Sequence, residues 1–294
     1  ELTDMPIILA LALSAFGAEN SLVSGPVETV RGGHQFTEGP LYLPGGPLLF
    51  SDIPADTIFR ANGTLFRMPS GQSNGLTLDR EGRLIACEHK NRRVTRTEQD
   101  GAVTVLAERY QGKRLNSPND AIVRSDGVLY FTDPPYGLSG GLKDPEAELG
   151  FCGVYKIDVA GKLILLVDDF VTPNGLALSP DEKTLYIADT QNKHVRAFDV
   201  VPDGTVSNSR IFCELPGPDG MKIDRDGRIW CTASDGVRVY DASGKLLETV
   251  AFPEVPSNCA FGDEDGHTLY VTARKGVYKV RTVSEGIRPM GSSK

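Results

Sequence analysis

The chain has 294 residues, of which 40% are hydrophobic and 24% are charged, a composition typical of a folded globular protein rather than a disordered one. Its net charge of −8 and the lack of a basic stripe make nucleic acid and anionic membranes poor partners, so we expect neither. The 32 glycines and 19 prolines favour many turns and short strands over long helices.

The first predicted element is an apolar stretch over residues 5–18, which is too short to span a bilayer. It has about the length of the hydrophobic part of a signal peptide, but acidic residues flank it instead of basic ones. We predict an N-terminal segment over 1–24, either a short helix or a signal-like sequence, followed by a folded domain over 25–294. The expected location is cytoplasmic, and periplasmic or secreted if the stretch is a signal.

Six similar segments follow at intervals of 36 to 55 residues, the spacing of four-stranded propeller blades. In each segment a small residue or proline precedes Glu, Asn or Asp, and a strand-like run comes next. Turn dipeptides such as Asp126-Gly127 separate this run from a second one, as a tight hairpin requires. The six segments begin at Thr37, Ser73, Pro118, Pro173, Pro218 and Ser257.

The sixth repeat lacks a fourth strand of its own. Residues 27–31 lie just upstream of the first repeat and can supply it, which would join the two ends of the ring and cover a sheet edge. The sequence therefore predicts an all-β fold, a six-bladed β-propeller with four-stranded blades closed by an N-terminal strand. A two-domain β-sandwich is the alternative, and the sixfold recurrence disfavours it.

The polar residue of each repeat is predicted to face the central axis, because the first strand of every propeller blade is innermost and all six run the same way. Acceptor-rich side chains that converge in this way need partners, and two facing carboxylates repel each other. A divalent cation would satisfy both requirements, whereas the alternative is that the residues only cap turns. Oxygen donors favour Ca²⁺, with Mg²⁺, Mn²⁺ or Zn²⁺ possible. The six residues are Glu38, Asn74, Asn119, Asn174, Asp219 and Asn258.

The longest interval lies in the third repeat and contains residues 134–150, which are rich in glycine, proline and charge. Long loops between strands often shape a binding site. We predict that Tyr136 contacts a substrate from this loop, the alternative being a passive surface excursion.

Four motifs together resemble the family of senescence marker protein, gluconolactonases and luciferin-regenerating enzyme. They are Glu38-Gly39-Pro40, Ser117-Pro118-Asn119-Asp120, Pro173-Asn174-Gly175 and Pro218-Asp219-Gly220. The resemblance implies that Glu38, Asn119, Asn174 and Asp219 hold one divalent metal ion, and that Arg114 and Asn116 bind substrate hydroxyls. Whether Asn116 or Asn119 is the ligand stays open. Asn74 and Asn258 are expected to hold water or substrate.

The resemblance also implies a metal-dependent lactonase that opens a sugar lactone or a similar small lactone, with Asp219 as general base. One alternative is an organophosphate hydrolase on the same metal site, in which Asp219 would attack as a nucleophile. The other alternative is a propeller that binds partners without catalysis and uses the metal only for structure.

Overall fold

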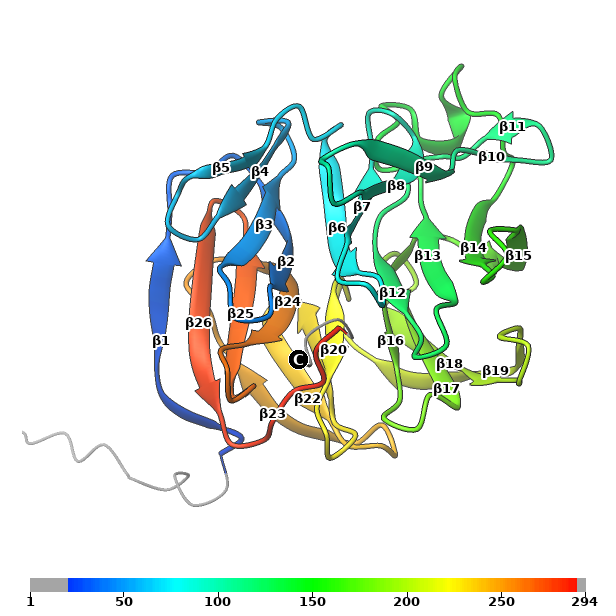
Figure 1. Ribbon diagram of the computed structural model, residues 1–294. Helices are drawn as coiled ribbons and strands as arrows, with labels where there is room; N and C mark the ends of the chain where they lie inside the picture. Colours follow the sequence, from blue (N-terminus) through cyan, green and yellow to red (C-terminus); the bar gives the residue numbers. More distant parts are fainter. Residues whose placement is uncertain (1–20, 290–294) are drawn as a thin grey trace, which may run out of the picture.

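The computed structural model describes residues 21–289, which form six four-stranded antiparallel sheets arranged as the blades of a propeller (Figure 1). Blades 1 to 5 each consist of four consecutive strands, and blade 6 takes its outer strand from the N-terminal side of the chain. The predicted six-bladed β-propeller is therefore confirmed.

Each blade is built from an inner, a second, a third and an outer strand. The inner strands are β2 (Thr37–Tyr42), β6 (Ser73–Leu78), β12 (Ala121–Val123), β16 (Pro173–Leu178), β20 (Met221–Ile223) and β24 (Pro256–Gly262). The second strands are β3 (Leu48–Asp52), β7 (Leu84–Glu88), β13 (Leu129–Asp133), β17 (Thr184–Asp189), β21 (Ile229–Ala233) and β25 (Thr268–Ala273). The third strands are β4 (Thr57–Arg60), β8 (Arg93–Thr97), β14 (Cys152–Ile157), β18 (His194–Val200), β22 (Gly236–Tyr240) and β26 (Gly276–Thr282). The outer strands are β5 (Leu65–Arg67), β9 (Val103–Ala107), β15 (Leu163–Phe170), β19 (Val206–Glu214), β23 (Leu246–Val250) and β1 (Val23–Arg31).

The ring is closed by β1, which pairs antiparallel with β26 from Val23 opposite Thr282 to Arg31 opposite Val277. The predicted closing strand is confirmed, and it begins four residues earlier than residues 27–31. The pairing covers the edge of β26 that would otherwise be free to recruit another chain. The predicted helix or signal-like segment falls mainly on residues 1–20, which lie outside the described residues.

Two short elements were not predicted. A hairpin of β10 (Arg109–Tyr110) and β11 (Lys113–Arg114) lies between blades 2 and 3, and the 3-10 helix η1 (Gly141–Lys143) lies in the long loop of blade 3. Over residues 21–289, no helix combines the length and the apolar character that crossing a bilayer requires.

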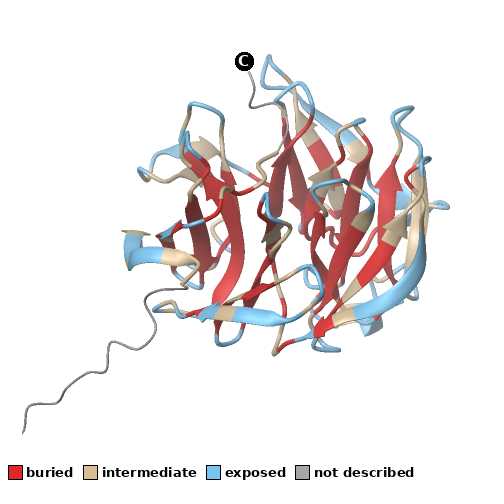
Figure 2. Cartoon of the chain, turned by 90° about the horizontal axis from the view of Figure 1, so that it is seen from below, coloured by how far each residue is buried: buried red, intermediate tan, exposed pale blue. Residues whose placement is uncertain are grey.

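Burial follows the position of each strand in its blade (Figure 2). The inner strand β2 is buried along almost its whole length, whereas the outer strand β19 is mostly exposed. Core side chains pack between neighbouring blades. Trp230 of blade 5, for example, contacts Phe261 of blade 6 edge to face, with 5.7 Å between the ring centroids. All five cysteines are buried free thiols.

Candidate metal and substrate site

The six polar repeat residues share one local backbone geometry, a β-bulge at the same end of each inner strand. In blade 1, Glu38 pairs with Ser51, but the next pair joins Leu41 to Leu49, so one residue is extra. The same irregularity in register occurs in β6, β16 and β24. In blades 3 and 5, the backbone groups of two consecutive residues hydrogen-bond to the backbone of a single threonine. Residues 119–120 pair in this way with Thr132, and residues 219–220 pair with Thr232. A bulge changes the direction of the side chain that it carries, and these bulges place the six residues at equivalent positions in their blades.

Glycines after the polar residues let neighbouring inner strands approach each other closely. A Cβ atom added to Gly39 would lie 2.0 Å from the carbonyl oxygen of Asn74, and one on Gly175 would lie 2.3 Å from that of Asp219. Because the side chain is missing, the Gly175 N–H can donate directly to the Asp219 carbonyl at 3.0 Å. These glycines therefore allow neighbouring inner strands to approach closely, and Gly39 also adopts a positive φ of 49°.

Hydroxyl groups on second strands hold the backbone of the ring residues in the next blade. Ser51 Oγ donates to the carbonyl of Asn74 at 2.8 Å, and Thr132 Oγ1 donates to the carbonyl of Asn174 at 2.8 Å. These buried bonds tie blade 1 to blade 2 and blade 3 to blade 4 at the level of the ring. A buried, well-paired network of this kind restrains the positions of the side chains that it supports.

The carboxylates of the ring lie close enough to influence one another. Burial raises the pKa of Glu38 to about 7, and the negative charge of Asp120 adds to this effect while the Gly39 N–H opposes it. Burial also raises the pKa of Asp219 well above its ordinary range, and the charges of Glu38 and Asp120 raise it further. Like charges held together in a buried site favour a bound cation. Of the six ring residues, Asp219 is the only one that is not fully buried.

Two of the ring amides carry buried oxygen atoms that have no hydrogen-bond partner, Asn74 Oδ1 and Asn174 Oδ1. An unpaired buried acceptor is costly unless something else occupies it. The donor set of carboxylate and amide oxygens matches the preference of Ca²⁺, so the residues present fit a divalent cation. Over residues 21–289 no group of three or more His, Cys, Asp or Glu side chains forms a metal-binding cluster, so amide oxygens have to complete the set.

Tyr136 reaches the ring residue Asn174 from the long loop of blade 3. Its hydroxyl is 3.5 Å from Asn174 Nδ2, and burial of the hydroxyl together with the nearby Asp219 charge raises its pKa. The loop is anchored because the Gly137 N–H donates to Ser117 Oγ at 2.8 Å, and Ser117 Oγ donates to the Pro134 carbonyl at 2.6 Å. The side chain of Tyr136 is 46% exposed, so it also faces the solvent side of the ring.

Asn116 and Asn119 occupy different places. Asn119 is part of the blade 3 bulge and belongs to the ring. Asn116 is completely buried, and its Nδ2 donates to the carbonyls of Asp133 at 3.0 Å and Phe151 at 2.9 Å. These two carbonyls stand at the two ends of the long loop of blade 3. The amide hydrogens of Asn116 are therefore engaged in holding that loop, while its Oδ1 is buried without a hydrogen-bond partner, like those of Asn74 and Asn174.

Arg114 is a half-buried residue of β11, and its hydrogen bonds reach blade 2 and the long loop of blade 3. Its Nη2 donates to the carbonyl of Asn91 at 3.3 Å, and its N–H donates to Glu148 Oε2 at 2.7 Å. Arg114 is thus fixed at the rim between blades 2 and 3. Within residues 21–289, no hydrogen bond joins Arg114 to a ring residue.

Sequence reasoning missed several residues around the ring. Asp120 is buried, and Asn258 Nδ2 lies 3.4 Å from its Oδ2, which joins blades 3 and 6 across the axis. His89 is buried, with its Nε2 3.4 Å from Asn74 Nδ2, and burial lowers its pKa to about 4. Thr190 hydrogen-bonds Asn174. The second polar residue in Ser117-Pro118-Asn119-Asp120 could have indicated Asp120, but no sequence signal marks the other two.

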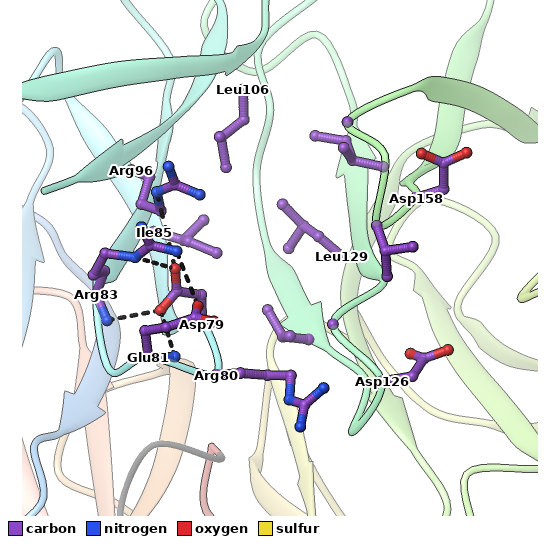
Figure 3. Close-up of a pocket in the computed structure, with 15 residues that line it drawn as sticks. Asp79, Arg80, Glu81, Arg83, Ile85, Arg96, Leu106, Asp126, Leu129 and Asp158 are labelled. Carbon is purple, nitrogen blue, oxygen red and sulfur yellow. Dashed lines mark hydrogen bonds and ion pairs between the residues drawn. The ribbon is translucent and has the colours of Figure 1, made fainter.

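A cavity of about 320 Å³ lies between blades 2 and 3 at the opposite ends of their inner strands (Figure 3). Arg83 and Arg96 converge on Asp79 along one wall, and Leu106 and Leu129 lie across the opening. No ring residue lines this cavity. It is therefore separate from the candidate site.

Comparisons with known proteins agree with the resemblance seen in the motifs. The profile of the SMP-30/gluconolactonase/LRE-like region matches residues 36–275. Gluconolactonase of Zymomonas mobilis is 32% identical over 297 residues, covering 90% of this chain and 83% of that protein. A gluconolactonase structure from Xanthomonas campestris superposes with a TM-score of 0.79 at 35% identity, covering 87% of this chain and 89% of the other. A structural-genomics X-ray structure, assigned to the gluconolactonases by its protein family, gives a TM-score of 0.83 at 33% identity over 89% and 93% of the two chains.

Proposed function

The chain belongs to the SMP-30/gluconolactonase/LRE-like family, and we propose that it is a metal-dependent lactonase that hydrolyses a sugar lactone or a similar small lactone. Glu38, Asn119, Asn174 and Asp219 would hold the metal ion, with Ca²⁺ as the ion that best suits their oxygen atoms. The observation that carries the proposal is that Asn174, with its unpartnered buried amide oxygen, and the partly exposed residue Asp219 occupy equivalent positions in neighbouring blades. The relatives named gluconolactonase supply the substrate class.

The reaction requires a water molecule to add to the lactone carbonyl carbon and the ring C–O bond to break. A divalent cation bound on the axis would stabilise the negative charge that develops on the lactone oxygen and would lower the pKa of a water molecule. Asp219 would accept the proton of the attacking water as general base. The proton then passes to the ring oxygen, which leaves as a hydroxyl group, and the new carboxyl group stays on the product and releases its own proton to solvent.

The residues around Asp219 would support this chemistry without taking a proton themselves. Tyr136 lies over the ring and can donate a hydrogen bond to a substrate oxygen, because its raised pKa keeps the hydroxyl protonated. Asn74 lies in the same ring and presents an unpaired oxygen atom to a substrate hydroxyl or a water molecule. Arg114 stands at the rim, where a longer substrate could reach it.

Substitution of Asp219 by Asn tests the base assignment. The amide keeps an oxygen donor for the metal but cannot accept the proton, so kcat should fall by about 100-fold or more. The measurement is proton release from a panel of sugar lactones, with chelated protein reloaded separately with Ca²⁺, Mg²⁺, Mn²⁺ and Zn²⁺. Calorimetric titration of the same variant checks that it still binds the metal. Turnover near the wild-type value in metal-loaded Asp219→Asn would exclude Asp219 as the base.

The dependence on metal is tested by the chelated wild-type protein itself. We expect lactone hydrolysis to disappear on chelation and to return when the divalent ion is restored. Hydrolysis that is unchanged after complete removal of the metal would contradict the metal-dependent mechanism. No hydrolysis of any lactone under any of these conditions would contradict the proposed activity.

A further inference from the structure

Thr190 lies directly after the second strand of blade 4, in the turn between β17 and β18, at the ring end of the blade. Its hydroxyl group makes two hydrogen bonds. Its Oγ1 is 2.9 Å from Asn174 Nδ2 and 2.7 Å from the carbonyl oxygen of Pro218. The two partners belong to blades 4 and 5, and Pro218 immediately precedes Asp219. One hydroxyl group therefore links the two neighbouring residues that are proposed to hold the metal ion.

The chemistry of the two bonds fixes their direction. A threonine hydroxyl has a single hydrogen, and a backbone carbonyl can only accept. The hydroxyl hydrogen of Thr190 must therefore point at Pro218, which leaves its oxygen as an acceptor for the amide group of Asn174. Only the Nδ2 end of that amide can donate, so the Oδ1 end must face the other way. This Oδ1 atom is the buried oxygen that has no protein partner.

We propose that Thr190 is a positioning residue of the metal site, which turns the side-chain oxygen of Asn174 toward the axis and fixes the backbone in front of Asp219. The proposal rests on the proposed metal-dependent function for the identity of the ligand, a divalent cation. Groups behind a metal ligand fix its orientation, and their removal typically weakens metal binding by about 10- to 100-fold. Without the hydroxyl, the Asn174 amide nitrogen keeps only the longer 3.5 Å contact with the Tyr136 hydroxyl, so the amide is held less firmly and can present its NH₂ group to the cation.

Blade 2 repeats the arrangement with different chemistry. His89 also follows directly after the second strand of its blade, and its Nε2 lies 3.4 Å from Asn74 Nδ2. The oxygen atom of that amide is likewise buried and without a partner. In both blades, the residue after the second strand therefore contacts the amide nitrogen of a ring asparagine and leaves the amide oxygen without a protein partner. This recurrence supports a role for the contact in orienting the amide oxygen.

The test compares Thr190→Val and Thr190→Ser. Valine has nearly the shape of threonine but lacks the hydroxyl, whereas serine keeps it. Thr172 supplies a matched control. Its Oγ1 accepts a hydrogen bond at 2.9 Å from the N–H of Gln191, which lies in the same turn as Thr190, and no hydrogen bond joins the Thr172 hydroxyl to a ring residue. Calorimetric titration of chelated protein with Ca²⁺ gives the affinity of each variant, and lactone hydrolysis is measured in parallel at saturating Ca²⁺.

We expect Thr190→Val to bind Ca²⁺ about 10- to 100-fold more weakly than wild type, with Thr190→Ser and Thr172→Val close to wild type. Equal Ca²⁺ affinity in Thr190→Val and wild type would overturn the proposal while leaving the lactonase assignment intact. Weaker binding in Thr190→Val, together with no lactone hydrolysis by wild type, would support the role of Thr190 and reject the proposed activity. A wild-type protein that binds none of Ca²⁺, Mg²⁺, Mn²⁺ and Zn²⁺ would overturn the proposal, because there would be no ligand for Thr190 to position.

Discussion

Replacement of Glu38 by Gln should change how the stability of the metal-free protein depends on pH. Burial raises the pKa of the Glu38 carboxyl group from 4.5 to about 7 in the folded protein. The unfolded chain ionises this group near 4.5, so the folded state binds more protons between these two values. A raised carboxyl pKa stabilises the folded protein fully below pH 4.5, and that contribution is lost as the pH rises through about 7.

The size of the effect follows from the pKa difference. At 1.36 kcal/mol for each pKa unit, wild type should lose about 2–3 kcal/mol of unfolding free energy between pH 5 and pH 8 relative to Glu38→Gln. The variant keeps the shape of the side chain and carries no charge at either pH. Comparison with wild type cancels the contributions of shared groups that do not interact with Glu38. Asp219 does interact with it, because the Glu38 charge raises the pKa of Asp219.

The assay is urea denaturation of both proteins at pH 5 and pH 8 in the presence of a chelator, followed by far-UV circular dichroism. Glu264→Gln is the control, because Glu264 is an exposed carboxylate that makes no hydrogen bond or ion pair within the described part of the chain. Saturating Ca²⁺ should stabilise wild type more at pH 8 than at pH 5, since the ion offsets the buried charge. An identical pH dependence in wild type and Glu38→Gln would refute the buried-charge reasoning.

Two further substitutions test the structural parts of the site. Gly175→Ala would place a Cβ atom 2.3 Å from the Asp219 carbonyl oxygen, so we expect the unfolding free energy, measured by thermal or urea unfolding, to fall by about 1–3 kcal/mol and metal binding to weaken. Gly150→Ala is the control and should be nearly neutral, because its added Cβ atom meets no atom within 4 Å. Asn116→Ala removes the donor to two buried carbonyls and should cost about 1–3 kcal/mol of stability; a variant with unchanged stability and a raised KM would instead show that Asn116 binds substrate.

The architecture could be predicted because its signal is local and repeated. Each blade needs the same strands and turns, so the sequence shows the same pattern six times, and the missing sixth outer strand pointed to residues 27–31. The positions of Glu38, Asn174 and Asp219 on one ring followed from equivalence between repeats. These predictions required no knowledge of which blade touches which.

The details of the site depended on contacts between residues that are distant in sequence. Asn258 reaches Asp120 across 138 positions of sequence, and the bond from Thr190 to the Pro218 carbonyl spans 28. No repeat pattern encodes such pairs, because each occurs at one junction of the ring and uses a different residue type. The bulges also escaped prediction, since their sequence signature of a polar residue and glycine is equally consistent with a turn.

Asn116 illustrates the limit most clearly. In the sequence it stands three residues before Asn119, and either asparagine could serve as the metal ligand. The fold separates them, since one lies in a bulge of the ring and the other donates to carbonyls at both ends of the long loop. The sequence by itself determined the six blades and the ring of polar residues. Only the tertiary structure decided which way each amide faces, because that depends on the hydrogen-bond partners that the neighbouring blade brings to it.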